Sequence, residues 1–130
     1  MSNNSDLLLS IRPKIEVFTK KSSINESFQS ETLRPILKFQ NETLVSIFSF
    51  YLKENKIPFS EQSIEKKDET IHAILKKNMA FKNLTIGLII GHFTTVELSF
   101  YNVNKSEINK RIVELAIKRL SDQKEKIKIA

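Results

Sequence analysis

Few side chains in this sequence combine the types and the spacing that catalysis or metal binding needs. There is no cysteine, and the two histidines, His72 and His92, stand far apart in the chain. Neither belongs to an HExxH or HxH spacing, although a zinc site needs three or four ligands. GxSxG, GxGxxG and P-loop motifs are also absent from the sequence. We therefore expect a non-enzymatic protein with no catalytic residue, no metal and no cofactor.

Two consecutive amides, Gln40 and Asn41, are the polar residues whose position needs an explanation. On a helix they fall within an otherwise apolar arc, and a buried amide without partners costs about 1–3 kcal/mol. We predict that both are buried and hydrogen-bonded. The partner is a neighbouring helix end or loop, a polar group across an interface, or a ligand. A pocket near Gln40, Asn41 and His92 would make the protein a small-molecule binder or an enzyme.

The amides belong to a long helix expected over residues 33–55. Its apolar positions cover roughly 240° of arc when projected at 100° per residue, which is wider than one packing partner covers. Phe39, Thr43 and Phe50 lie on one flank of that arc. The excess apolar arc is explained if this is the central helix of the domain, or if the flank is an interface. Phe39, Thr43 and Phe50 are therefore candidate interface residues.

Capping residues, prolines and apolar periodicity delimit the other elements. A short helix is expected over residues 6–12, a mobile connection over 20–30, and an N-cap at Thr32 for the long helix. The remaining helices are expected to begin after a capping residue. They are 64–77 after Ser63, 79–91 after Asn78, 95–101 after Thr94 with Glu97 completing a capping box, and 105–120 after Asn104 with Glu107.

The segment over residues 79–91 is apolar nearly all round, a pattern typical of a buried helix. Ala80, Gly87 and Gly91 project onto one narrow side of it. A glycine inside a helix costs about 1 kcal/mol relative to alanine. Close packing of another helix would offset that cost, so we expect a second backbone to approach this side.

The net charge of +6 is unevenly distributed, because residues 105–130 hold 8 of the 21 basic and only 4 of the 15 acidic residues. On the helix expected over 105–120, Lys110, Arg111 and Lys118 share one face with Glu114. A basic face can contact phosphates, so these three cations are candidate anion contacts, and a basic nucleic-acid-binding protein is one interpretation. A solvated face with i, i+4 ion pairs is the other.

Composition places the chain among globular proteins. Its 130 residues are 40% apolar and 28% charged, which suits one soluble domain over residues 1–130. Two glycines and three prolines are too few for the turns of an all-β fold. We predict an all-α compact bundle of about five to six helices around the long helix, with a partly ordered segment over 1–31 and a frayed tail over 121–130. Neither a membrane span of about 20 apolar residues nor a signal peptide is visible, so a cytoplasmic location is expected.

Three segments resemble a group of small bacterial helical proteins without an assigned function, some of which carry the name glyoxalase. They are TLRPILKFQN (32–41), IGLIIGHFT (86–94) and INKRI (108–112). The likeness runs from about Leu7 to Leu120, and it brings no active-site residues with it. Metal-dependent glyoxalases use paired βαββ modules or a histidine-rich motif, and this sequence has neither.

The leading hypothesis is a non-enzymatic, cytoplasmic helical protein that acts by protein–protein contact, as a homodimer. It rests on the excess apolar arc of the helix over residues 33–55. A nucleic-acid-binding protein and a small-molecule binder or enzyme are the alternatives.

Overall fold

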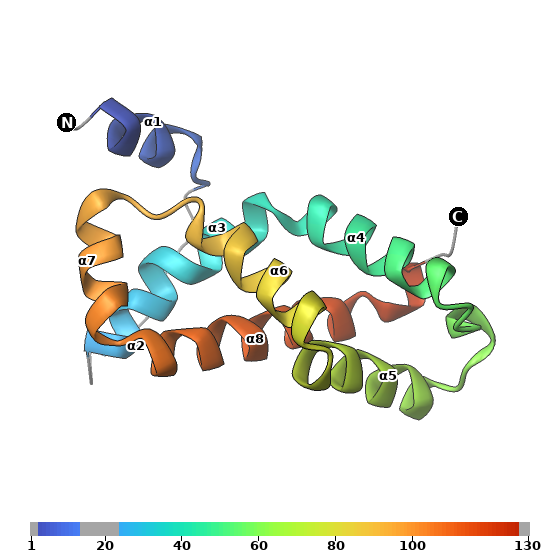
Figure 1. Cartoon of the computed structure of the whole chain (residues 1–130). Helices are drawn as coiled ribbons and strands as arrows, with labels where there is room; N and C mark the ends of the chain where they lie inside the picture. The colour runs from blue at the N-terminus through green and yellow to red at the C-terminus, as the bar shows by residue number, and fades with distance from the viewer. Residues whose placement is uncertain (1–2, 14–23, 128–130) are drawn as a thin grey trace.

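The computed structural model describes residues 3–13 and 24–127, and every regular element within these ranges is helical (Figure 1). The predicted all-α class is confirmed. Within the same ranges, no helix is both long enough and apolar enough to cross a membrane. The α-helices are α1 (Asn3–Ile11), α2 (Ile24–Phe28), α3 (Arg34–Phe39), α4 (Asn41–Glu54), α5 (Ile64–Lys77), α6 (Met79–Ile90), α7 (Thr95–Val103) and α8 (Lys105–Asp122). Shorter turns are π-helical at Gln29–Leu33 and 3-10 at Phe59–Glu61 and Lys124–Lys126.

Helix α8 packs against α3, α5, α6 and α7, and it runs through the middle of the molecule (Figure 1). Its residues Ile112, Ala116 and Leu120 recur every four positions, so they share one face, and all three are fully buried. Full burial of an Ile or Leu side chain contributes roughly 1.5–3 kcal/mol to the free energy of unfolding. The core of the bundle is therefore organised around α8.

Helix α4 covers part of this core with Leu44, Phe48 and Leu52, which are also four residues apart and buried. The Phe48 ring packs edge-on against Phe59 and Phe81, with centroid separations of 5.7 and 5.9 Å. Aromatic pairs in this geometry contribute about 0.5–1.5 kcal/mol beyond the area that they bury. These contacts fix α4 against α6 and against the turn that follows α4.

The long helix predicted over residues 33–55 is not continuous. The chain bends at Gln40, where φ is −92° and ψ is 11°, between α3 and α4. Backbone hydrogen bonds still cross the bend, because the Gln40 N–H donates to Ile36 O and the Leu44 N–H to Gln40 O, each at 2.9 Å. The bend lets α3 pack on α8 while α4 packs beside α6. The helix around which the others pack is α8, and not the helix predicted over residues 33–55.

Residues 24–33 are helical, which corrects part of the mobile connection predicted over 20–30. Residues 20–23 lie outside the described ranges. Helix α2 passes through the π-helical turn into α3, and Leu33 has helical φ and ψ of −68° and −47°. Thr32 therefore lies inside the helical path and does not act as an N-cap. Its hydroxyl instead donates to Glu97 Oε2 at 3.1 Å.

The helix starts predicted for α5, α6 and α7 are confirmed. The side chains of Ser63, Asn78 and Thr94 accept a hydrogen bond from the N–H three residues later, at 3.1, 2.8 and 3.2 Å. Helix α8 also begins after Asn104, as predicted, but the Asn104 side chain does not cap it, because its amide donates to the Phe100 carbonyl of α7 at 3.0 Å. A cap is a bond between near neighbours, so it depends little on the rest of the fold.

The tail predicted to fray over residues 121–130 packs against the rest of the protein as far as Ile127, which is buried. Lys67 Nζ forms an ion pair with Glu125 at 3.1 Å and lies 5.7 Å from the centroid of the Phe59 ring. These contacts tie the turn after α8 to α5. Residues 128–130 lie outside the described ranges.

Arg12 anchors α1 to the start of α7. Its guanidinium donates to both Glu97 carboxylate oxygens, at 2.7 and 2.9 Å, and to the His92 carbonyl at 3.0 Å. Burial acts to raise the pKa of Glu97, but hydrogen bonds from Arg12, the Thr94 backbone and Thr32, together with the charge of Arg12, hold the pKa below its usual value. The segment predicted as partly ordered is thus fixed at this point.

Helix α6 begins at the predicted residue and ends at Ile90, one residue before the predicted end, but it is not buried all round. Leu84 is 53% exposed, and Ala80, Gly87 and Gly91 are exposed beside it. A Cβ added at Gly87 would meet nothing within 4 Å. The close helix packing predicted on this side is therefore wrong within the described chain. The apolar sequence of α6 therefore does not by itself show whether a given face of the helix is buried or exposed.

Candidate functional site

The consecutive amides Gln40 and Asn41 point toward different helices. Gln40 Nε2 lies 2.6 Å from His92 Nε2 at the end of α6. Asn41 forms a reciprocal amide pair with Gln123 after α8, with N–O distances of 3.2 and 2.7 Å. Successive side chains on a helix diverge by about 100°, which explains the separation. Both amides are hydrogen-bonded as predicted, but they are half-buried and not buried. The structure places them in two separate sites and not in one pocket.

His92 follows the end of α6, and its side chain contacts two residues at the α3–α4 bend. Burial lowers the pKa of His92 and the charge of Arg12 lowers it further, so the ring is neutral at pH 7. A neutral ring can accept the Gln40 amide N–H at Nε2. The Phe39 ring packs edge-on against the imidazole, with centroids 5.3 Å apart. The two aromatic rings and the amide hold the bend in place.

Helices α4 and α6 lie antiparallel and side by side. Contacts join Gln40 to His92 at one end and Tyr51 to Asn78 at the other, where the Asn78 amide donates to the Tyr51 hydroxyl at 2.8 Å. Projection at 100° per residue puts the outer flanks of both helices on the same side of the pair. We call this the α4–α6 surface. It is formed by Phe39, Thr43, Ile47, Phe50, Ala80, Leu84, Gly87 and Gly91.

The α4–α6 surface is apolar, and most of its residues are exposed. Phe50 is 61% exposed and Phe39 is 47% exposed, and Thr43 is exposed between them. Within residues 39–54 and 79–91, Glu54 is the only charged residue that projects onto these flanks, at one end. The three predicted interface residues therefore share one surface. Leu84 and the two glycines of α6 join it, although the apolar sequence over residues 79–91 predicts a buried helix.

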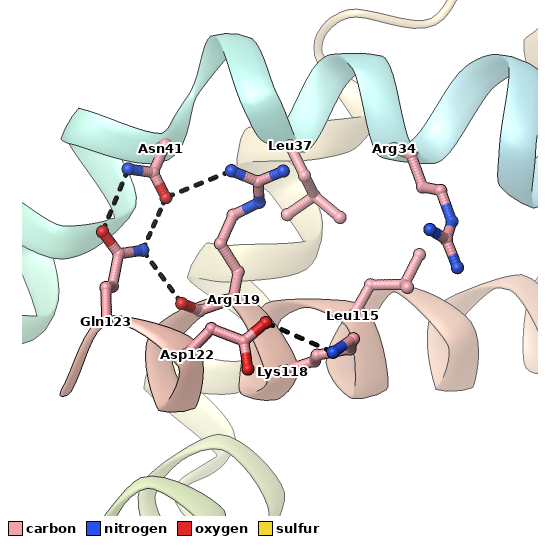
Figure 2. Close-up of a pocket in the computed structure, with 8 residues that line it drawn as sticks. All are labelled: Arg34, Leu37, Asn41, Leu115, Lys118, Arg119, Asp122 and Gln123. Carbon is pink, nitrogen blue, oxygen red and sulfur yellow. Dashed lines mark hydrogen bonds and ion pairs between the residues drawn. The ribbon is translucent and has the colours of Figure 1, made fainter. Parts of the chain in front are cut away.

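A second site lies between α3 and α8, where a pocket of about 380 Å³ opens to solvent (Figure 2). We call it the α3–α8 pocket. Arg34 of α3 and Arg119 of α8 both reach into it. Asn41 Oδ1 accepts from Gln123 at 2.7 Å and from the Arg119 guanidinium at 3.5 Å. The lining residues are Arg34, Leu37, Asn41, Leu115, Lys118, Arg119, Asp122 and Gln123.

The two arginines of this pocket lack a carboxylate partner. Within residues 3–13 and 24–127, neither Arg34 nor Arg119 lies within 4.0 Å of an acidic side chain. Asp122 pairs instead with Lys118, at 3.2 Å. Burial lowers the pKa of Arg119, attraction from Asp122 opposes that shift, and repulsion from Arg34 adds to it.

The three cations predicted to contact anions do not form one site. Arg111 is neutralised by Glu107 at 3.5 Å and by Glu114 at 3.4 Å. Lys118 lines the α3–α8 pocket, whereas Lys110 lines a separate hollow of about 610 Å³ between α6 and α8. Sequence reasoning missed Arg34 and Arg119. Each projects from its own helix beside residues of the pocket, but only the packing of α3 on α8 brings the two together.

Within residues 3–13 and 24–127, no group of three or more His, Asp or Glu side chains is placed to hold a metal ion. His72 is exposed on α5, and its Nδ1 lies 2.9 Å from the Asp68 carbonyl oxygen. Comparisons with protein families, curated proteins and solved structures gave no match. The resemblance to the glyoxalase-named group stays a prediction.

Proposed function

We propose that this protein acts by non-enzymatic protein–protein contact, as a homodimer formed through the α4–α6 surface. The observation that carries the proposal is Phe50, a large aromatic side chain that is 61% exposed on the same apolar surface as Leu84 and the open Gly87. Exposed apolar patches of this kind are typical of interaction sites, and aromatic residues are enriched in them.

A second copy of the chain suits this surface because the surface is self-complementary. It holds the projecting side chains Phe39, Phe50 and Leu84, and a shallow part is expected where the side chains of Ala80, Gly87 and Gly91 are small. A two-fold axis repeats the same patch on both subunits, so the aromatic rings of one protomer meet the small residues of the other. Small side chains also let the two helix pairs approach closely.

Charge favours the same arrangement. The chain carries a net charge of +6, so two copies repel one another over much of their surfaces. The α4–α6 surface has no basic residue, and contact there avoids placing like charges directly opposite each other. Burial of its apolar area provides the favourable free energy.

Sedimentation velocity at about 5–100 µM protein tests the proposal, because dimers of micromolar Kd dissociate in that range. We expect the wild type to dimerise and Phe50→Glu to be monomeric, since the new carboxylates would be buried against an apolar partner. Val103→Glu is the matched control, because Val103 is an exposed apolar residue of α7 outside the surface. A monomeric wild type throughout, or a Phe50→Glu variant that still dimerises, would refute the proposal. Loss of the dimer in Val103→Glu would move the interface to α7.

A further inference from the structure

We infer that the α3–α8 pocket is a binding site for a small organic anion, whose phosphate or carboxylate group lies between Arg34 and Arg119. The site lies on the α8 side of the bend, whereas the surface proposed for dimerisation lies on the α6 side. Neither proposal depends on the other.

The first argument is that two arginines line one pocket and neither is paired with a carboxylate among the described residues. On the same helix, Arg111 shows the usual arrangement, with Glu107 and Glu114 one turn away on either side. Arg119 has no such partner among the described residues, and Arg34 lines the other end of the same pocket, with Leu37 and Leu115 between the two side chains (Figure 2). Like charges held at one site repel, and an oxyanion placed between them converts repulsion into attraction. Guanidinium groups bind carboxylate and phosphate oxygens through paired N–H donors.

The second argument is that the cationic group is positioned in advance. Asn41 Oδ1 accepts from Arg119 at 3.5 Å and is itself held by the Gln123 amide at 2.7 Å. Gln123 also donates to the Arg119 carbonyl at 2.9 Å. This amide pair keeps the Arg119 side chain turned toward the pocket (Figure 2). A group that is already oriented loses less entropy when a ligand binds.

The third argument concerns the size and lining of the pocket. A volume of about 380 Å³ lies at the small end of the usual range for small-molecule sites, roughly 300–1,000 Å³. Leu37 and Leu115 provide apolar wall beside the charged groups. Three cations and one carboxylate line the pocket, which leaves a local charge of +2. The ligand class that fits is a compact molecule with one oxyanion group and a short apolar body.

Isothermal titration calorimetry at low salt tests the inference with phenyl phosphate, benzoate and the neutral analogue benzyl alcohol. We expect at least one anion to bind, with benzyl alcohol at least about tenfold weaker, because charged hydrogen bonds carry the affinity. The preferred anion distinguishes a phosphate ligand from a carboxylate ligand. Arg119→Gln and Arg34→Gln should each weaken binding by about tenfold or more. Arg111→Gln, the matched control on α8, should leave binding unchanged.

Three outcomes would overturn the inference. They are no binding of either anion, equal binding of benzyl alcohol, and an equal loss of affinity in Arg111→Gln. Circular dichroism verifies the fold of each variant. If Arg119→Gln does not fold, Arg34→Gln decides the question, because Arg34 is exposed and has no ion pair within the described residues. Anion binding that persists in both variants and is lost in Lys110→Gln would place the site in the hollow between α6 and α8.

Discussion

The two flanks of the α3–α4 segment differ in charge, although α3 and α4 are separated only by the bend at Gln40. On the α6 side, the α4–α6 surface has aromatic and small residues and no basic group. On the α8 side, the α3–α8 pocket has Arg34, Lys118 and Arg119 around a polar opening. Gln40 and Asn41 mark the division, since Gln40 bonds to His92 and Asn41 to Gln123.

The difference teaches that one helical segment can present two kinds of recognition surface. An apolar contact is stabilised by the removal of water from the buried area, and it depends little on the orientation of the groups that meet. Anion binding depends on oriented donors and weakens as salt screens the charges. Four comparisons test whether the two flanks behave independently in this way.

The largest effect is expected from comparing two phenylalanines of α4 that are two residues apart. Phe48→Ala should lower the free energy of unfolding by about 3–5 kcal/mol, because Phe48 is fully buried and the change leaves a cavity. Phe50→Ala should change the stability of the monomer by less than about 0.5 kcal/mol and weaken self-association. Urea unfolding and sedimentation velocity measure the two quantities. Equal losses of stability would contradict the division between core and surface.

The two amides should separate the flanks functionally. Gln40→Ala and Asn41→Ala should each cost about 1 kcal/mol of stability, as each removes hydrogen bonds at a half-buried position. Only Asn41→Ala should weaken anion binding, because it frees the Arg119 side chain. Only Gln40→Ala should raise the pKa of His92, because the neutral ring loses its donor. NMR titration and calorimetry follow these readouts, and the same response in both variants would mean that the flanks are coupled.

Gly87→Ala should stabilise the monomer by about 0.5–1 kcal/mol, since alanine favours the helix and the new methyl group meets open space. The same change should weaken the proposed dimer, because it fills the shallow part of the α4–α6 surface. Gly91→Ala is the comparison, as its Cβ would lie in van der Waals contact with the Gly87 carbonyl oxygen, at 3.4 Å, and not in open space. Thermal unfolding of dilute protein measures the stabilisation. A destabilised Gly87→Ala monomer would show that this face of α6 is covered.

The smallest effect expected is a pH dependence confined to the Gln40 flank. The pKa of His92 is below its ordinary value of 6.5, so the folded chain binds this proton less tightly than the unfolded chain does. Stability from this group is present above pH 6.5 and decreases as the pH falls through the folded-state pKa. His92→Gln should remove the decrease in urea midpoint between about pH 7 and 5.5. Benzoate binding should stay constant over that range, because arginines do not titrate there; a parallel decrease would link the two flanks.

Local features of this protein follow from the sequence. The caps at Ser63, Asn78 and Thr94 join atoms three residues apart, so their geometry depends on nearby sequence alone. Helical periodicity likewise separates Phe48, on the centre of its face, from Phe50, on the flank. The exposed Phe39, Thr43 and Phe50 were identified for that reason.

Tertiary packing decided the rest. Arg34 and Arg119 come from distant parts of the chain, and no local pattern links them until α3 packs on α8. Whether the apolar sequence of α6 is buried, and where the helical path bends, depends equally on which helices lie alongside. The sequence by itself determined which residues share a face of each helix, because that is a property of 3.6 residues per turn. Only the folded chain decided what each face meets, because burial and charge are set by neighbours brought together across the whole chain.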